Sequence, residues 1–171
     1  MRLEPLISTD DIQAKVGELA GAVERDGTKD LLLIGVLKGS LHFLSDFSRR
    51  LRCDVQIDFI SVSSYADGKE SSGIVQIRKD LDTNIEGRDV LIVEDIVDTG
   101  ATLRHLRELL GTRKPRSLRV VSLLSKLQAR GISSDIEYVG FEIPDEFVVG
   151  YGLDYGERYR NLPYIAILRE G

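Results

Sequence analysis

Residues 90–103 read VLIVEDIVDTGATL, and this stretch decides the fold. Its first four residues are an apolar run, which is typical of a strand buried on both faces of a parallel sheet. The segment that follows has leucines at helical spacing and then Gly111, so it predicts a helix that ends there. These leucines are Leu103, Leu106, Leu109 and Leu110. The stretch therefore predicts a central strand, a short loop at its carboxyl end, and a helix.

Acids and small residues share the end of this strand and the loop: Glu94, Asp95, Asp98, Thr99, Gly100, Ala101 and Thr102. Open α/β sheets bind ligands at such strand ends, and the N–H groups of a helix N-terminus favour a phosphate. Ionised carboxylates would repel that phosphate unless a cation or hydroxyl groups intervene. Mg²⁺ is the natural cation, because it bridges carboxylates to phosphates. The loop thus predicts a sugar phosphate bound with Mg²⁺.

Glu94 and Asp95 are adjacent in the sequence. Successive side chains of a strand point to opposite faces, so we expect the two carboxylates on different sides. They are therefore poor candidates for a pair that shares one proton. The alternative is an ordinary strand end with solvated acids and a helix cap, but the whole run of acids and small residues favours a ligand site.

Strands and helices alternate along the rest of the chain. Ser8 or Thr9 can cap a first helix, and a second helix after Lys38-Gly39-Ser40 is expected to turn Leu41, Leu44, Phe47 and Leu51 inward. Residues 65–73 are polar and predict an exposed mobile loop. Strands are predicted at 31–37, 55–59, 74–78 and 118–124, with shorter ones at 138–143, 147–149 and 164–168.

This alternation predicts an α/β fold with a parallel-rich sheet flanked by helices. The short C-terminal strands have no helices between them, so we expect a small hood over the sheet edge, built from the terminal segments. The sequence contains no repeat, linker or low-complexity tract. We therefore expect one domain over residues 1–171, with a core at about 10–145 and a C-terminal hood segment at about 146–171.

The composition narrows the class of protein. With 23 basic and 28 acidic residues, the net charge is −5, which argues against bulk binding of nucleic acid. Cys53 is the only cysteine, so an intrachain disulfide is impossible, as suits a reducing cytoplasm. No apolar run approaches a membrane span, and the N-terminus does not resemble a signal peptide.

Other nucleotide and hydrolase motifs are absent from the sequence. It has no Gly-x-x-x-x-Gly-Lys-Ser/Thr loop and no Gly-x-Ser-x-Gly elbow, and the glycines from Gly150 onward miss the dinucleotide spacing. His42 and His105 lie within amphipathic helices, where surface or satisfied roles are favoured over metal binding. The strand-end acids therefore remain the main candidate site.

Several motifs together resemble a known family. VEDIVDTGAT at 93–102 is similar to the phosphoribosyl-pyrophosphate signature of type I phosphoribosyltransferases, and GVLKG at 35–39 resembles the pyrophosphate loop of the hypoxanthine-guanine members. Ser64-Tyr65 resembles the pair on their mobile loop. VGFEIPDEFVVGYGLDY at 139–155 is close to their purine-binding stretch, and Arg160 falls where they place a pyrophosphate-binding arginine. The resemblance runs from about residue 10 to the C-terminus, with the motifs in family order.

The resemblance implies purine salvage: Mg²⁺-dependent transfer of the 5-phosphoribosyl group from phosphoribosyl pyrophosphate to N9 of hypoxanthine or guanine. Glu94 and Asp95 would hold the ribose hydroxyls, directly or through Mg²⁺. Asp98 to Thr102 would cradle the 5-phosphate. Lys38, Gly39 and Arg160 would approach the pyrophosphate, and the peptide bond before that lysine is often cis in related enzymes.

On the purine side, the resemblance makes Asp98 the acceptor of the N7 proton. Lys126 would donate to the 6-oxo group, which argues against adenine because a protonated lysine cannot accept from an amino group. Phe147 would stack on the purine, the Val148 backbone would read its edge, and Asp154 would bind a Mg²⁺ that also holds pyrophosphate. The loop that begins at Ser64-Tyr65 would close over the site.

Two other functions stay open at this point. A non-enzymatic regulator on the same fold could sense a nucleotide, although the negative charge and the presence of Asp98 with Lys126 argue against it. A xanthine-preferring phosphoribosyltransferase is the second alternative. Animal members usually carry lysine where this chain has Ala101. The resemblance also implies a homodimer or homotetramer.

Overall fold

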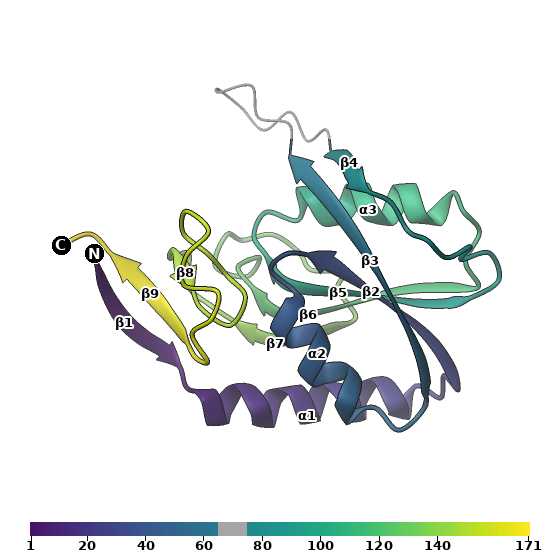
Figure 1. Ribbon diagram of the computed structural model, residues 1–171, viewed down its shortest axis with the longest axis horizontal. Helices are drawn as coiled ribbons and strands as arrows, with labels where there is room; N and C mark the ends of the chain where they lie inside the picture. The colour runs from purple at the N-terminus through teal and green to yellow at the C-terminus, as the bar shows by residue number, and fades with distance from the viewer. Residues whose placement is uncertain (65–74) are drawn as a thin grey trace.

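The computed structural model describes residues 1–64 and 75–171 (Figure 1). In this part of the chain, the main sheet has the strand order β4-β3-β2-β5-β6-β7, and only β4 runs antiparallel to its neighbour. The strands are β2 (Asp30–Leu37), β3 (Asp54–Ser64), β4 (Val75–Lys79), β5 (Asp89–Val97), β6 (Ser117–Ser125) and β7 (Tyr138–Glu142). The predicted parallel-rich sheet is confirmed.

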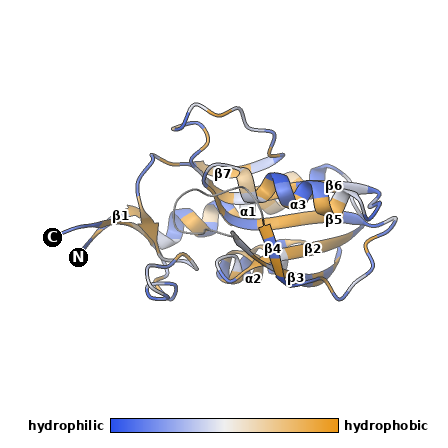
Figure 2. Ribbon diagram, turned by 90° about the horizontal axis from the view of Figure 1, so that it is seen from above, coloured by the Kyte–Doolittle hydropathy of each residue, from blue (hydrophilic) through white to orange (hydrophobic). Residues whose placement is uncertain are grey.

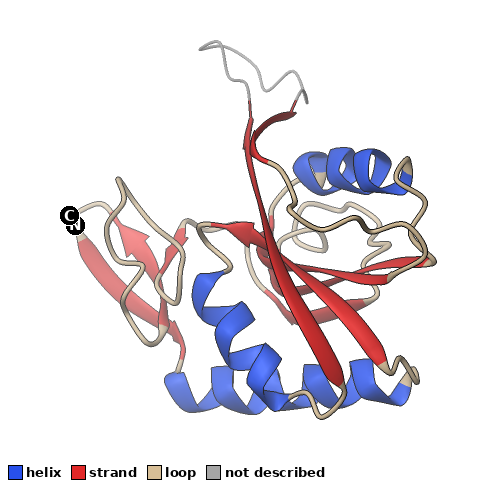
Figure 3. Ribbon diagram, turned by 45° about the vertical axis from the view of Figure 1, so that its right-hand side comes forward, coloured by secondary structure: helices blue, strands red, loops and turns tan. Residues whose placement is uncertain are grey.

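Helices cover both faces of this sheet (Figure 3). They are α1 (Thr9–Arg25), α2 (Leu41–Arg50) and α3 (Ala101–Gly111). Helices α1 and α2 pack on each other on one face, and α3 lies on the other. None of the helices in the described residues combines the length and the apolarity needed to cross a membrane.

The uninterrupted apolar runs of β2 and β5 supply both cores. In β2, Leu31 and Leu33 join the core beneath α1 and α2, whereas Leu32 and Ile34 join the core beneath α3. Residues 90–93 of β5 divide in the same way. Because side chains alternate across a strand, a strand covered on both faces must be apolar throughout. Figure 2 shows these two strands as hydrophobic along most of their length.

A second, smaller sheet forms the hood, with the order β1-β9-β8 and antiparallel pairing. Its strands are β1 (Arg2–Ile7), β8 (Val148–Val149) and β9 (Ile165–Arg169), so the two chain ends lie side by side (Figure 1). The predicted hood is confirmed, but β1 was not predicted as a strand. Its exposed Glu4 and Pro5 break the apolar pattern, and β9 supplies the hydrogen-bonding partner.

Two local expectations were wrong. The strand at 138–143 does not belong to the hood, because β7 extends the main sheet in parallel with β6. Leu41 does not face inward: it is 49% exposed, and α2 instead buries Phe43 together with Leu44 and Phe47. Leu41 is the first residue of the helix, outside the stripe that Phe43, Leu44 and Phe47 turn toward the core.

Candidate active site

A crevice opens where the chain switches direction along the sheet. Strand β2 pairs with β3 on one side and with β5 on the other, so the carboxyl ends of β2 and β5 lie at a topological switch point. A cavity of about 260 Å³ lies here. It is lined by Val36, Val62, Glu94, Ile96, Val97, Asp98, Thr99, Gly100, Ala101, Thr102 and Leu103. The structure therefore brings the whole predicted phosphate loop into one cavity, together with Glu94.

The N-terminus of α3 at this cavity has no side-chain cap. Gly100 precedes the helix with a φ of 86°, a left-handed conformation that glycine adopts without strain. The Ala101 N–H donates to Thr99 Oγ1 at 3.3 Å, which is a long contact, and no side chain of Gly100 exists to accept. Free N–H groups at the positive end of a helix dipole suit a phosphate.

Glu94 and Asp95 were expected to point to different sides of β5, but their carboxyl groups lie within hydrogen-bond reach of each other. Glu94 faces the cavity, whereas the Asp95 carboxylate lies against Gly39, so closely that a Cβ there would fall 1.8 Å from Oδ2. Gly39 is thus required where β2 ends. No lysine or arginine of the described residues lies within ion-pair distance of either acid, although the charge of Arg160 is near enough to lower the pKa of Asp95.

Burial and mutual repulsion nevertheless couple these two acids. Burial, with the nearby Asp95 charge, raises the pKa of Glu94 well above its ordinary value. Burial also raises the pKa of Asp95 to about 6. The expectation that these two acids are poor candidates for sharing one proton was therefore wrong, because their carboxyl groups are close enough to share a hydrogen bond.

The loop after β2 meets the hood at a second glycine contact. The Leu37–Lys38 peptide bond is cis. Gly152, with a φ of 101°, packs on the carbonyl of Gly39, where a Cβ would lie 2.1 Å from the oxygen. This contact brings the hood loop that carries Asp154 and Arg160 up to the loop that carries Lys38.

Charged side chains meet at this junction. Glu157 accepts from Lys38 Nζ at 2.9 Å and from the Arg160 guanidinium at 3.1 Å. Arg160 Nη2 also lies 3.5 Å from Asp154 Oδ1, and its Nη1 donates to the carbonyl of Gly152 at 2.7 Å. The structure therefore places Lys38, Asp154 and Arg160 together, as expected. Sequence reasoning missed Glu157, and its place three residues before Arg160 was the only available signal.

The predicted purine side lies at the neighbouring strand ends. Lys126 is buried, and its Nζ lies 3.9 Å from both Asp98 Oδ2 and Asp145 Oδ1. It is therefore not a solvated strand end. Phe147 is 51% exposed and meets Tyr155 edge-on at 5.7 Å. An aromatic side chain so exposed can stack on a flat ligand, and the next residue, Val148, is buried in β8.

Arg130 is a further charged residue that sequence reasoning missed. Its guanidinium contacts Asp98 Oδ1 at 2.6 Å and Asp145 Oδ1 at 3.0 Å. Its spacing of four residues from Lys126 was the available signal, because one helical turn places such residues on the same side. Of the predicted loop pair, Ser64 ends β3, whereas Tyr65 and the rest of 65–73 lie outside the described residues.

The described residues contain no group of three or more His, Cys, Asp or Glu side chains spaced to hold a metal ion. This arrangement still fits Mg²⁺, because Mg²⁺ usually takes only one or two carboxylates and fills its other positions with waters and substrate phosphates. Carboxylates with raised pKa values suit a cationic ligand that arrives with the substrate.

A switch-point crevice with an acid-ended strand, an uncapped phosphate loop and a small hood defines the class of protein: a type I phosphoribosyltransferase. The phosphoribosyl transferase domain family matches residues 8–156. A hypoxanthine-guanine phosphoribosyltransferase of Mycobacterium avium is 54% identical over 95% of this chain and 84% of its own length. The enzyme of that name from Bacillus subtilis strain 168 is 51% identical, over 96% of this chain and 92% of its own.

Solved structures agree with these relatives. A hypoxanthine-guanine phosphoribosyltransferase of Bacillus anthracis matches with a TM-score of 0.92 and 48% identity, over 97% of this chain and 98% of that one. Among the sequence relatives, the bifunctional TilS/HprT protein of Listeria innocua is 51% identical over 96% of this chain, which corresponds to 26% of that longer protein. The chain therefore belongs to the phosphoribosyltransferase family, in its hypoxanthine-guanine group, and the resemblance stated from the sequence is confirmed.

Proposed function

We propose that this enzyme transfers the 5-phosphoribosyl group of phosphoribosyl pyrophosphate to N9 of hypoxanthine or guanine, giving the nucleotide and pyrophosphate. The observation that carries the proposal is the meeting of two half-sites at one sheet edge. The uncapped N-terminus of α3 lies beside Glu94, and Asp98, in the same loop, lies 3.9 Å from the buried Lys126.

The phosphoribosyl half-site uses the crevice. The N–H groups and hydroxyls of residues 98–102 hold the 5-phosphate, and Ala101 contributes its backbone rather than a charged side chain. Glu94 and Asp95 hold the ribose hydroxyls. Lys38, Gly39 and Arg160 receive the pyrophosphate.

Three residues form the purine half-site: Lys126, Phe147 and Val148. Phe147 stacks on the ring, and the Val148 backbone reads its edge. Lys126 donates to the 6-oxo group, an arrangement that favours an oxopurine over adenine. As N9 bonds to the ribose carbon, the bond from that carbon to the pyrophosphate oxygen breaks. Asp98 then takes the proton from N7, and the acids of the crevice stabilise positive charge on the ribose.

Mg²⁺ held by Glu94, Asp95 or Asp154 would neutralise the pyrophosphate as it leaves. Residues of the chain itself do the remaining work. Lys38 and Arg160 orient the leaving group, and the buried setting of Glu94 limits access of water to the ribose carbon.

One panel tests this function. Purified protein receives Mg²⁺, phosphoribosyl pyrophosphate and one of hypoxanthine, guanine, xanthine, adenine or uracil, and nucleotide formation is followed by absorbance. We expect turnover with hypoxanthine or guanine, little with adenine or uracil, and loss of turnover when EDTA removes Mg²⁺. Turnover with xanthine above both other oxopurines would instead indicate the xanthine enzyme, and no turnover with any base would support the regulator.

The remaining expectations concern the state of the protein. We propose a homodimer or homotetramer located in the cytoplasm. Light scattering of the purified protein measures its mass, and a mass near 19.1 kDa would contradict the proposed assembly.

A further inference from the structure

The turn that follows β6 fixes two cations on one side of the backbone. The Arg130 N–H donates to the carbonyl of Lys126 at 3.0 Å, which closes one helical turn. Gly131 then takes a φ of 69°, and the Ile132 N–H returns to the carbonyl of Leu127 at 2.9 Å. Because Leu127 is buried in the core beneath α3, the turn is anchored. Lys126 and Arg130 therefore project from a fixed platform.

Arg130 joins two acids that come from different segments. Asp98 belongs to the loop between β5 and α3, and Asp145 to the loop between β7 and β8. The same nitrogen, Nη2, contacts Oδ1 of Asp98 at 2.6 Å and Oδ1 of Asp145 at 3.0 Å. These two short ion pairs hold the guanidinium between the carboxylates and restrict the rotation of both.

The two oxygens of Asp98 are thereby made different. Oδ1 is taken by Arg130, whereas Oδ2 lies 3.9 Å from Lys126 Nζ, beyond hydrogen-bond distance. Oδ2 is therefore the oxygen that stays available to a ligand beside Lys126. Asp145 lies two residues before Phe147. Arg130 therefore links Asp98 to the loop that carries the exposed Phe147 ring.

We propose that Arg130 is a positioning residue: it holds Oδ1 of Asp98 so that Oδ2 is directed at the N7 proton of the bound purine, while Asp145 holds Arg130 in place. This inference rests on the proposed function. In this proposal, Arg130 acts on the reaction only through Asp98. Small errors in the orientation of a catalytic group can cost about 10²-fold in rate.

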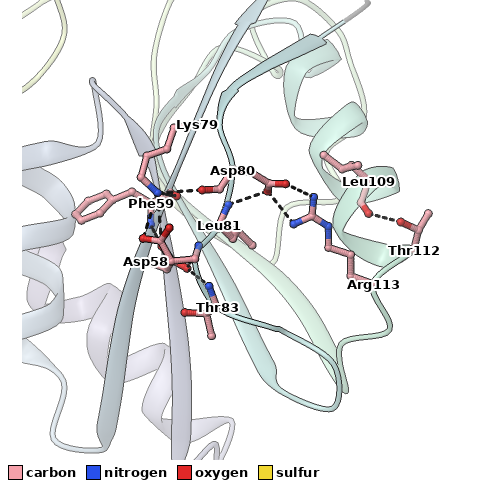
Figure 4. A network of polar contacts seen from close by, with 10 residues as sticks. Asp58, Phe59, Lys79, Asp80, Leu81, Thr83, Leu109, Thr112 and Arg113 are labelled. Carbon is pink, nitrogen blue, oxygen red and sulfur yellow. Dashed lines mark hydrogen bonds and ion pairs between the residues drawn. The ribbon is translucent and has the colours of Figure 1, made fainter.

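The test is a double-mutant cycle with a matched control. Arg130→Met, Arg130→Lys and Asp145→Asn are measured for kcat, for the KM of the base and for Tm, and Arg130→Met is repeated in an Asp98→Asn background. Arg113→Met is the control, because Arg113 pairs with Asp80 at 2.8 Å through two nitrogens (Figure 4) and its side chain is 30% exposed, against 31% for Arg130. It lies outside the site.

We expect Arg130→Met to lower kcat by about 10–100-fold with a change in base KM below about threefold. Arg130→Lys should recover part of the loss, and Arg113→Met should leave kcat unchanged. In the Asp98→Asn background, Arg130→Met should lower kcat by less than about twofold, because a residue that acts through Asp98 has nothing left to position.

Equal fold losses in both backgrounds would overturn the proposal, as would a loss confined to KM. If Arg130→Met does not fold, Arg130→Lys and Asp145→Asn are carried through the same cycle. Full activity of Asp98→Asn alone would overturn the positioning role, yet turnover by the wild type would leave the transferase function standing. Absence of turnover by the wild type with every base is the separate result that defeats the proposed function.

Discussion

Two regions of this sheet bury an acid, and the pKa values of these acids are shifted in opposite directions. At the β3–β4 edge, Asp58 accepts backbone N–H groups of Phe59, Asp82 and Thr83 at 2.7, 3.0 and 2.9 Å (Figure 4). Burial would raise the pKa of Asp58, but these donors more than offset it, so its pKa lies below the ordinary value. In the crevice, Glu94 is also buried, yet its pKa is raised.

The two sites differ in the donors that they offer and in how deeply they bury the carboxylate. Three backbone N–H groups, with the Thr83 side chain and Lys79 at 4.0 Å, serve Asp58, so this carboxylate stabilises the loop after β4. Glu94 and Asp95 have each other as neighbours and no ion-pair partner among the described residues. Asp95 accepts the N–H of Ile96 at 2.7 Å, but fewer backbone donors serve these two acids than serve Asp58, which leaves them available to a ligand.

The largest effect should come from Asp98, beside the crevice. Asp98→Asn keeps the shape of the side chain but removes the acceptor of the N7 proton, so kcat should fall by about 10²–10⁴-fold. Because the side chain is half-exposed, Tm should change by no more than a few degrees. Steady-state kinetics and a thermal melt measure the two quantities. A near-normal kcat would remove Asp98 from the role of proton acceptor.

Asp58→Asn should show the reverse behaviour. Oδ2 of Asp58 accepts from two backbone N–H groups and Oδ1 from a third, so an amide nitrogen at either position leaves a buried donor unpaired. The free energy of unfolding should fall by about 2–3 kcal/mol, and kcat/KM should stay within about twofold of the wild type. Urea denaturation measures the free energy of unfolding, and the phosphoribosyl-transfer assay measures kcat/KM.

The pH dependence of the stability difference between wild type and Asp58→Asn is the control for this prediction. The pKa of Asp58 is lower in the folded state, so its contribution is present above the unfolded value of about 4. It is lost as the pH falls through the folded value. The stabilities of wild type and Asp58→Asn should therefore converge in acid, and a difference that stays constant down to about pH 2 would contradict the cause assigned to it.

Glu94→Gln should raise the stability of the protein while it weakens the binding of phosphoribosyl pyrophosphate. It removes a charge where burial opposes the charged form, so the free energy of unfolding at pH 7 should rise by about 0.5–2 kcal/mol. Loss of a charged partner for the ribose should raise the KM for phosphoribosyl pyrophosphate by about 10–100-fold. Destabilisation by Glu94→Gln would mean that this acid serves the fold, as Asp58 does.

Glu157→Gln should have the smallest effect. Glu157 is exposed and occupies Lys38 and Arg160, the two cations proposed for pyrophosphate. Its neutralisation should lower the KM for phosphoribosyl pyrophosphate by about twofold to fivefold, as expected for exposed ion pairs. Glu4→Gln, which breaks an exposed pair with Arg169 in the hood, is the control and should leave that KM unchanged. A raised KM in Glu157→Gln would indicate that Glu157 itself supports the site.

Part of the site could be predicted because its residues are contiguous. The phosphate loop is one segment, so the apolar run before it and the leucines after it were enough to locate it at the end of a central strand. Strand alternation did not predict that the carboxyl groups of Glu94 and Asp95 would come within hydrogen-bond reach of each other at the strand end. Arg130 escaped notice because its partners, Asp98 and Asp145, are 32 residues before it and 15 after it in the chain.

The sequence by itself determined which strands are buried on both faces, where each helix begins, and which loop offers N–H groups to a phosphate. These properties follow from side-chain periodicity over a few residues, and this periodicity is visible in the amino-acid sequence. Only the tertiary structure decided that β1 closes the hood on β9, that Gly152 rests on Gly39, and that Arg130 fixes Asp98. Such contacts depend on which distant strand ends the sheet brings together, and local periodicity carries no information about that pairing.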